Sequence, residues 1–134
     1  LVLAAVPYGN AMHGEFVFDD AFAVRDNRDV VGPYGVSGGI LAHDFWGQDI
    51  SKHDSHKSYR PITTLTFRLN FMTTGLSTVA FHATNVALHS TVSSLLYILS
   101  RKLLCSPAGS LLGALVFAAH PVHTEAVTGI VGRS

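Results

Sequence analysis

The second half of the chain consists of long uncharged stretches separated by short charged markers. No Asp, Glu, Lys or Arg occurs in residues 69–100 or in residues 103–124. Each stretch could cross a hydrocarbon core of about 30 Å, which takes roughly 20 helical residues. The pattern therefore predicts a mainly α-helical protein with transmembrane helices at 79–100 and 108–120.

The first of these helices carries polar side chains at helical spacing. His82, Asn85 and His89 are three or four residues apart, so they share one helix face. Polar groups cost free energy in lipid unless they face other protein, so we expect this face to pack against the rest of the chain. The same composition would also fit the core of a soluble domain, or a transport path through a membrane.

The first half of the chain predicts the end of a membrane helix followed by a long loop. Residues 1–8 are apolar and lack the charged start of a signal peptide, so we expect them to be the exit end of a first transmembrane helix. Residues 9–78 form a loop rich in Gly, Pro, Asp and Ser, with short helical pieces and a helix start at Pro61. Residues 32–39 are a glycine-rich hinge within this loop.

The basic pair Arg101 and Lys102 sets the predicted orientation. The pair lies in the short connection 101–107 between the two helices, and positive charge favours the cytosolic side of a membrane. The loop at 9–78 and the last residues, 121–134, would then face the lumen or the exterior.

Composition limits the classes of partner. Hydrophobic residues make up 48% of the 134 positions and charged residues 13%, against about 25% charged residues in a typical soluble domain. Fourteen of the charged side chains lie in residues 1–68. The net charge of zero excludes a basic nucleic-acid surface, and the single cysteine, Cys105, cannot form an internal disulfide.

Two adjacent acids, Asp19 and Asp20, follow the apolar residues 16–18 and are candidate catalytic groups. Partial desolvation and a second carboxylate nearby both raise the proton affinity of a carboxylate. A general base that accepts the proton of a hydroxyl group needs such an affinity. Paired acids are also common at helix N-termini, where they complement the helix dipole. Paired acids are common on solvated loops as well, so the catalytic and the structural interpretations both stay open at this point.

The segment 52–61 gathers basic side chains in the same loop. His56, Lys57 and Arg60 combine an imidazole, an ammonium and a planar guanidinium, which together suit a phosphate group. A basic loop beside lipid headgroups would have the same composition, so both interpretations stay open at this point.

The run HPVHTE contains possible zinc ligands in His120, His123 and Glu125. Its spacing does not favour zinc, because a zinc-protease helix needs two histidines four residues apart with a Glu beside the first. Here the histidines are three apart and Pro121 intervenes. We therefore predict no metal site, and we expect His120 to end one helix and Glu125 to begin the next.

Five separated motifs cover nearly the whole chain: GEFVFDDAFAVRDNRDV, DFWG, SHKSYRPITTLTFRLN, FHATNVALH and LVFAAHPVHTEAVTGIVGR. In this order they resemble the N-terminal region of the TMTC proteins, the transmembrane and tetratricopeptide-repeat-containing O-mannosyltransferases. The glycine-rich PYGVSGG segment departs from the family's pattern. The resemblance implies an N-terminal fragment, without the TPR region, of a polytopic GT-C glycosyltransferase with a long luminal loop between its first two transmembrane helices.

The resemblance also implies roles for single residues. The family's luminal acidic motif falls on Asp19 and Asp20, which would be the catalytic acids. Its H-x-S-Y-R-P motif falls on His56, Lys57 and Arg60, which would bind the donor phosphate. The match at HPVHTEAV marks the two histidines and the glutamate of that run as groups that could touch the substrate or support the site.

The implied reaction transfers mannose from dolichyl-phosphate mannose to Ser or Thr hydroxyls of cadherin or protocadherin domains, at the membrane of the endoplasmic reticulum. Asp19 or Asp20 would take the hydroxyl proton, and attack opposite the phosphate would invert the anomeric carbon. Arg60 or Lys57 would stabilise the leaving phosphate, and no metal or other cofactor is implied. Taken alone, the residues also fit a non-catalytic membrane scaffold that docks a luminal partner, or a membrane metalloenzyme that uses HPVHTE.

Overall fold

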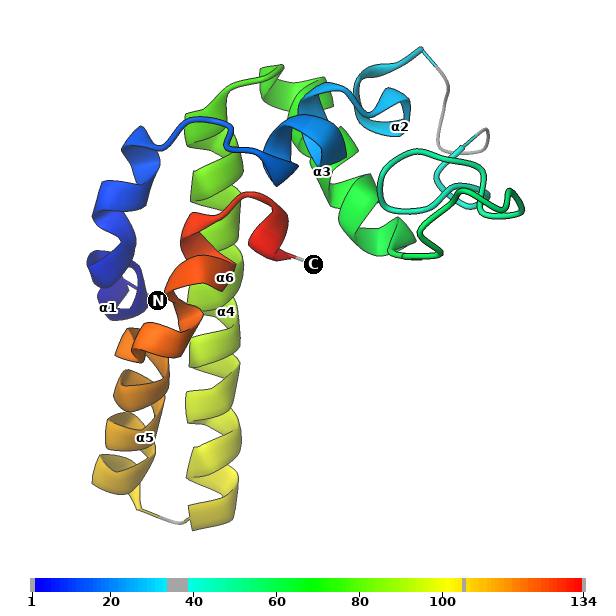
Figure 1. Cartoon of the computed structure of the whole chain (residues 1–134). Helices are drawn as coiled ribbons and strands as arrows, with labels where there is room; N and C mark the ends of the chain where they lie inside the picture. Colours follow the sequence, from blue (N-terminus) through cyan, green and yellow to red (C-terminus); the bar gives the residue numbers. More distant parts are fainter. Residues whose placement is uncertain (1, 34–38, 105, 134) are drawn as a thin grey trace.

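The structure is built of helices joined by turns and by one long irregular loop (Figure 1). The computed structural model describes residues 2–33, 39–104 and 106–133, and no strand occurs in these ranges. The prediction of a mainly α-helical chain is therefore confirmed. The elements, in which η marks a 3-10 or π turn, are α1 (Val2–Ala5), η1 (Val6–His13), η2 (Ala21–Arg25), α2 (Arg28–Val31), α3 (Pro61–Thr74), α4 (Thr78–Leu104), α5 (Pro107–Ala119), η3 (Pro121–His123), α6 (Thr124–Thr128) and η4 (Val131–Arg133).

Helices α4 and α5 form a long antiparallel hairpin (Figure 1). α4 continues through the basic pair to Leu104, so the helix is longer than the predicted 79–100 and the connection is shorter than 101–107. α5 begins at Pro107, whose fixed φ suits the first helical turn. The hydroxyl of Ser106 accepts a hydrogen bond from the amide of Gly109 at 3.2 Å and caps this end of α5.

The polar side chains of α4 lie on one buried face, as their spacing predicts. His82, Asn85 and His89 are 3%, 4% and 9% exposed. Nε2 of His89 lies 3.1 Å from the carbonyl oxygen of Ala118 on α5. Nδ2 of Asn85 donates a hydrogen bond to the carbonyl oxygen of Gly129 at 2.7 Å. The polar face therefore joins α4 to α5 and to the last segment of the chain.

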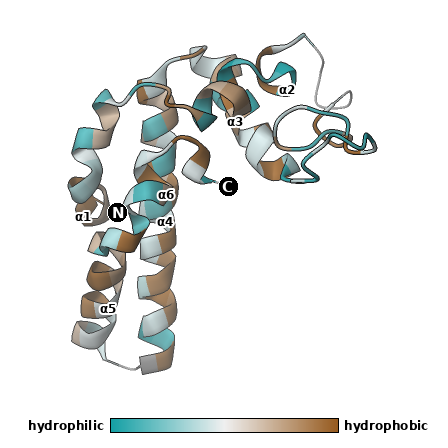
Figure 2. Ribbon diagram, in the orientation of Figure 1, coloured by the Kyte–Doolittle hydropathy of each residue, from teal (hydrophilic) through white to brown (hydrophobic). Residues whose placement is uncertain are grey.

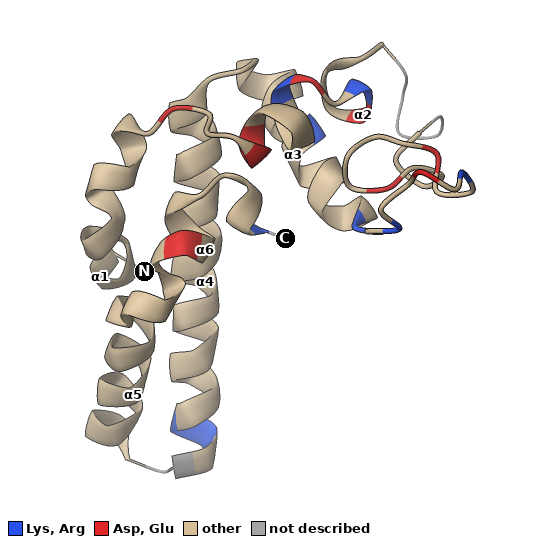
Figure 3. Ribbon diagram, in the orientation of Figure 1, with Lys and Arg blue, Asp and Glu red and all other residues tan. Residues whose placement is uncertain are grey.

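Charged and apolar residues lie in different parts of the molecule, as expected from the fourteen charged side chains in residues 1–68. Figure 3 shows most acidic and basic residues around α2, α3 and the irregular loop, whereas the hairpin carries charge near its connecting turn. Figure 2 shows apolar residues along α1, α5 and the adjoining part of α4. Within the described ranges, no helix is both long enough and apolar enough to cross a membrane.

The main hydrophobic core lies where the first half of the chain packs against α3 and the start of α4. Its buried residues come from segments far apart in the sequence: Ala23, Val24, Val30, Phe45, Phe67, Phe81 and Ile130. A second buried cluster joins η1, α4 and α6 through Tyr8, Val86 and Val127. Burial of these apolar groups holds both the η2 segment and the end of the chain against α4.

One buried carboxylate, that of Asp44, organises the long loop. It accepts hydrogen bonds from the amides of Trp46 (3.0 Å), Gln48 (3.0 Å) and His56 (3.2 Å) and from the hydroxyl of Ser55 (2.6 Å). Burial alone would raise the pKa of Asp44, but these four donors together hold it below its usual value. The loop is therefore irregular in backbone shape and yet internally bonded.

Helix α3 is the most regular part of the region predicted as loop 9–78. It begins at Pro61, as predicted, and ends before Gly75, whose φ of 64° lies in the left-handed region that favours glycine. This helix has 14 residues, so the expectation of only short helical pieces is wrong here. The reason is tertiary, because Phe67 of α3 is fully buried in the main core. The predicted hinge at 32–39 lies mostly outside the described residues, which resume at Gly39.

Candidate active site

An open depression beside η2 brings together acids from distant parts of the chain. Asp19 and Asp20 directly precede η2, and Glu125 lies in the first turn of α6. All three line the depression, which has a volume of about 390 Å³. The other lining residues are Val17, Phe18, Gly129, Val131 and Gly132. Glu125 of the run at 120–125 therefore meets the acidic pair at one site, whereas His120 and His123 do not line this depression.

Asp20 is the buried member of the acidic pair, at 3% exposure, and Asp19 is exposed. Oδ2 of Asp20 accepts a hydrogen bond from the amide of Val17 at 3.1 Å, which closes the turn before η2. Oδ1 of Asp20 accepts another from the amide of Val131 at 2.9 Å. One local and one distant backbone donor thus fix the orientation of this carboxylate, while Asp19 stays open to solvent.

The turn that carries the acids has a strained backbone. Phe18 has a φ of 22°, which residues other than glycine rarely adopt. Its side chain is 79% exposed and meets the ring of Phe22 edge to face, with 6.1 Å between the ring centroids. Strained residues of this kind cluster at functional sites, and this one directly precedes Asp19.

The run at 120–125 divides between a helix end and a helix start, as predicted. His120 follows the last residue of α5, and its Nδ1 accepts a hydrogen bond from the amide of Val122 at 3.2 Å. α6 begins at Thr124, which places Glu125 in its first turn. Among the described residues, no three His, Cys, Asp or Glu side chains are grouped so that they could hold a metal ion.

His123 packs into an aromatic cluster between α4 and α5. Its ring centroid lies 4.4 Å from that of Phe117 and 5.3 Å from that of His89. Burial, and then the neighbouring imidazoles, lower the pKa of His123 below its usual value. This ring is therefore neutral near pH 7, and its contacts are those of a packing residue.

The three basic residues predicted for a phosphate are engaged in different ways. Lys57 has a φ of 57°, and its Nζ donates to two carbonyl oxygens of its own loop at 2.5 and 2.6 Å. The guanidinium of Arg60 lies over the ring of Phe45, 5.0 Å from the ring centroid. His56 is exposed, and its amide is one of the donors to Asp44. Phe45 shares the main core with residues of η2, but none of the three basic residues lines the acidic depression.

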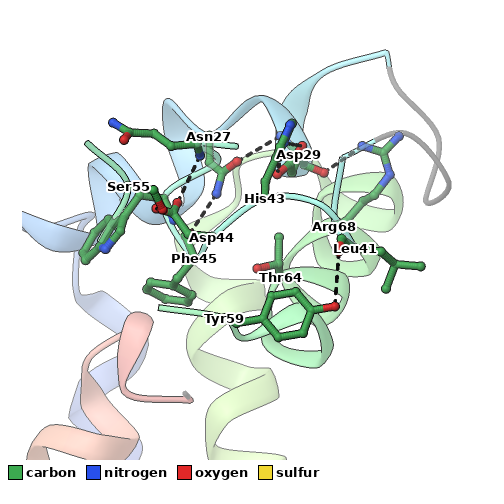
Figure 4. Close-up of polar contacts among 12 residues, drawn as sticks. Asn27, Asp29, Leu41, His43, Asp44, Phe45, Ser55, Tyr59, Thr64 and Arg68 are labelled. Atoms are coloured by element: carbon green, nitrogen blue, oxygen red, sulfur yellow. Dashed lines mark hydrogen bonds and ion pairs between the residues drawn. The ribbon is translucent and has the colours of Figure 1, made fainter. Parts of the chain in front are cut away.

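A buried polar network between α2 and the loop has almost no signal in the sequence pattern (Figure 4). The carboxylate oxygens of Asp29 lie 2.9 and 3.0 Å from Nδ1 of His43. Nδ2 of Asn27 donates to the carbonyl oxygen of Phe45 at 3.1 Å, and Nη1 of Arg68 donates to that of Asp29 at 2.9 Å. A polar hollow of about 550 Å³ opens beside the network. The one local hint is a charged residue, Arg68, within the otherwise uncharged α3.

Nearly the whole chain is similar to curated proteins named protein O-mannosyl-transferase. It is 45% identical over 128 residues to TMTC1 of Homo sapiens, covering 95% of this chain. It is 42% identical to TMTC4 of Homo sapiens and 42% identical to Tmtc1 of Drosophila melanogaster, each over 98% of this chain. The chain belongs to the TMTC family.

This TMTC chain spans only a small part of its relatives. It covers 14% of the length of human TMTC1, 20% of human TMTC4 and 15% of Drosophila Tmtc1. No family model matches the chain, and no solved structure matches it. The resemblance carried by the five motifs is confirmed, and the acidic depression is a feature of a TMTC segment.

Proposed function

We propose that the TMTC protein to which this chain belongs transfers mannose from dolichyl-phosphate mannose to Ser or Thr hydroxyls of acceptor proteins. The shared name of its relatives supports the type of reaction. The observation that carries the assignment to this chain is the open depression where Asp19, Asp20 and Glu125 meet. We further propose cadherin or protocadherin domains as acceptors, and a reaction that uses no metal or other cofactor.

In the proposed step, the acceptor oxygen forms a bond to the anomeric carbon of mannose while the bond from that carbon to the phosphate oxygen breaks. The hydroxyl proton passes to the carboxylate of Asp19 or Asp20, because a Ser or Thr hydroxyl is a weak nucleophile without a base at neutral pH. The phosphate leaves with the electron pair. Attack from the opposite side inverts the anomeric configuration, so the step needs no covalent enzyme intermediate.

The geometry of the acids supports their proposed role. The amides of Val17 and Val131 hold Asp20 in one orientation, and a base must be oriented to meet its hydroxyl at hydrogen-bond distance. Asp19 is exposed beside it, within reach of an acceptor that enters the depression. Glu125 lines the same depression and offers a further acceptor for the hydroxyls of the sugar.

Within the basic loop, we assign Arg60 as the main contact of the donor phosphate. Its exposed guanidinium lies on the ring of Phe45, and a planar fork of donors matches a phosphate. Lys57 and the exposed His56 would assist. The positive charge would stabilise the leaving phosphate.

A membrane arrangement is part of the proposal. We place residues 1–8, 79–100 and 108–120 in the membrane of the endoplasmic reticulum, and residues 9–78 and 121–134 in its lumen. Exposed apolar side chains along the hairpin support this placement: Val92, Leu95, Ile98, Leu99, Leu111, Leu112 and Val116. The acidic depression would then face the luminal acceptor domains.

The test uses the full-length protein with Asp19→Asn or Asp20→Asn, in cells that lack the endogenous activity. In the variant that lacks the base, we expect O-mannose on cadherin domains, quantified by mass spectrometry, to fall by roughly a hundredfold or more. Asp26→Asn is the matched control and should keep full activity, because Asp26 is a nearby exposed acid that pairs with Arg25.

Full activity of both Asp19→Asn and Asp20→Asn, at equal expression and membrane insertion, would overturn this proposal. A non-catalytic scaffold would then explain the acidic loop. Loss of wild-type activity with a zinc chelator, with bound zinc in the purified protein, would instead favour a metalloenzyme that uses residues 120–125.

A further inference from the structure

Arg133 reaches from η4 into the space between α3 and α4. Its Nε donates a hydrogen bond to Oδ1 of Asn85 on α4 at 2.7 Å. Its Nη1 donates to Oδ1 of Asn70 at 2.9 Å and to Oγ1 of Thr66 at 3.2 Å, both on α3. Its Nη2 donates to the carbonyl oxygen of Phe81 at 3.0 Å. The guanidinium therefore ties the end of the chain to two helices at once.

The surroundings of this guanidinium are aromatic and uncharged. Its central carbon lies 4.9 Å from the ring centroid of Phe67 and 5.9 Å from that of Phe81. Burial lowers the pKa of Arg133 to about 10, so the side chain stays charged near pH 7. Removing part of a charged group from water is costly unless the group is hydrogen-bonded, and four oxygen acceptors match the planar fork of this half-buried guanidinium. The guanidinium has therefore one well-defined position.

The backbone that leads to Arg133 is closely packed. Nδ2 of Asn85 donates to two carbonyl oxygens of the preceding turn, at 2.7 and 3.3 Å. At Gly132, an added Cβ would lie 2.6 Å from the carbonyl oxygen of Ala126, so η4 crosses α6 at a distance that only glycine allows. A displacement of the Arg133 side chain is therefore passed to Val131, the first residue of η4.

Val131 connects this anchor to the acidic site. Its amide donates to Oδ1 of Asp20 at 2.9 Å. We propose that Arg133 is a positioning residue for Asp20: it fixes η4 so that the Val131 amide holds the carboxylate toward the depression. The effect on rate rests on the proposed function, since it requires the acids to act in catalysis. Arg133 itself needs no contact with donor or acceptor.

The first test is hydrogen exchange of the Val131 amide in the full-length protein. Arg133→Lys keeps the charge and removes the planar fork, so protection of this amide should fall by about tenfold relative to the wild type. Arg68→Lys is the matched control, because Arg68 is a second arginine near the core and donates to the carbonyl oxygens of Asp29 and Gly32. Protection that is unchanged in Arg133→Lys would overturn the inference.

The second test is a double-mutant cycle on the rate of mannose transfer. Arg133→Lys should lower kcat by about tenfold and leave the acceptor KM unchanged, because only the orientation of a group in the transition state is lost. In an Asp20→Ala background the same change should cause no further loss, because the residue through which it acts is gone. Any loss from Arg68→Lys should be the same in both backgrounds.

An equal loss from Arg133→Lys with and without Asp20 would show a purely structural role and overturn the inference, even if the acids are catalytic. Full activity of the Asp19 and Asp20 variants would overturn the proposed function itself, so the two failures are distinguishable. If Arg133→Lys does not fold, Thr66→Val provides the same tests, because it removes one acceptor of the guanidinium and otherwise one bond within α3. The loss of kcat should then be smaller than in Arg133→Lys, and it should again disappear in the Asp20→Ala background.

Discussion

Two buried carboxylates hold the irregular parts of this molecule together. Asp44 collects donors within one loop, and Asp20 joins the turn before η2 to Val131 at the far end of the chain. Both work for the same reason, since a backbone amide that has lost contact with water needs another acceptor. The two differ in how far along the sequence their donors lie. The donors to Asp44 are within twelve residues of it, whereas Asp20 binds the amide of a residue 111 positions away.

Asp44→Asn should change the stability of the protein in a pH-dependent way. The fold holds the pKa of Asp44 below its usual value, so its carboxylate contributes stability that is present above about pH 4 and is lost as the pH falls through the folded pKa. We expect the variant to lose about 1–3 kcal/mol of unfolding free energy at pH 7, and the difference from wild type to narrow below about pH 4. Denaturant unfolding of the purified proteins at a series of pH values measures the loss of unfolding free energy at pH 7 and its decrease at low pH.

The control for this experiment is Asp54→Asn, on an exposed acid of the same loop. It should follow the wild type at every pH. A difference between Asp44→Asn and wild type that stays constant from neutral to acid pH would contradict the prediction, because the contribution of the carboxylate would then not depend on its charge.

At the scale of elements, close packing of η4 on α6 decides the shape of the acidic site. In Gly132→Ala, the added Cβ would lie 2.6–2.8 Å from three backbone atoms of Ala126, so η4 has to move away from α6. The amide of Val131 would then leave Asp20. Under the proposed function, we expect transfer activity to fall by roughly tenfold to a hundredfold, since small misplacements of a catalytic group have effects of this size. O-mannose on the acceptor, quantified by mass spectrometry, provides the measurement.

Gly113→Ala is the matched control at the same scale. Gly113 lies within α5, and an added Cβ there meets no atom within 4 Å. This change should leave activity unaltered and stabilise the helix by about 0.5–1 kcal/mol. An equal loss of activity in both variants would point to a general effect of helix changes and would contradict a specific role for η4.

At the scale of the whole molecule, segregation of charge is the basis of the proposed orientation. Figure 3 shows most charged residues around α2, α3 and the irregular loop, whereas the basic residues in the last turn of α4 lie near the turn of the hairpin, at the opposite end of the molecule. We therefore expect Lys52→Asn combined with Asp54→Thr to gain one N-linked glycan, because both residues are exposed and the change creates an acceptor sequence in the loop. A shift in gel mobility that an endoglycosidase reverses is the measurement.

Lys52→Asn alone is the control, because it lacks the hydroxyl residue that glycosylation requires and should stay unmodified. Absence of a glycan in the double variant, at normal expression, would contradict a luminal loop. The basic pair would then have to be explained without the positive-inside rule.

Local pattern predicted where two helices begin and which face of α4 is buried, whereas the length of α3 depended on its burial in the core. The starts of α3 and α5 follow from prolines, whose φ is fixed by their own ring. The buried polar face of α4 follows from the spacing of His82, Asn85 and His89, because helical period is a property of adjacent residues. Asp19 and Asp20 stood out as an adjacent pair in the same way. Their assignment to a mannose-transfer site came from the five-motif resemblance, which the relatives confirm at the level of the family.

The contacts between residues that are far apart in the sequence could be found only in the tertiary structure. The meeting of Glu125 with the acidic pair, and the bond from the Val131 amide to Asp20, depend on how η4 and α6 pack beside η2. A backbone amide is present at every residue except proline, so no residue type marks the one that will serve as a donor. Arg133 likewise stands in the sequence as one more isolated charge. Its acceptors come from its packing between α3 and α4, where a guanidinium that is partly removed from water needs hydrogen bonds.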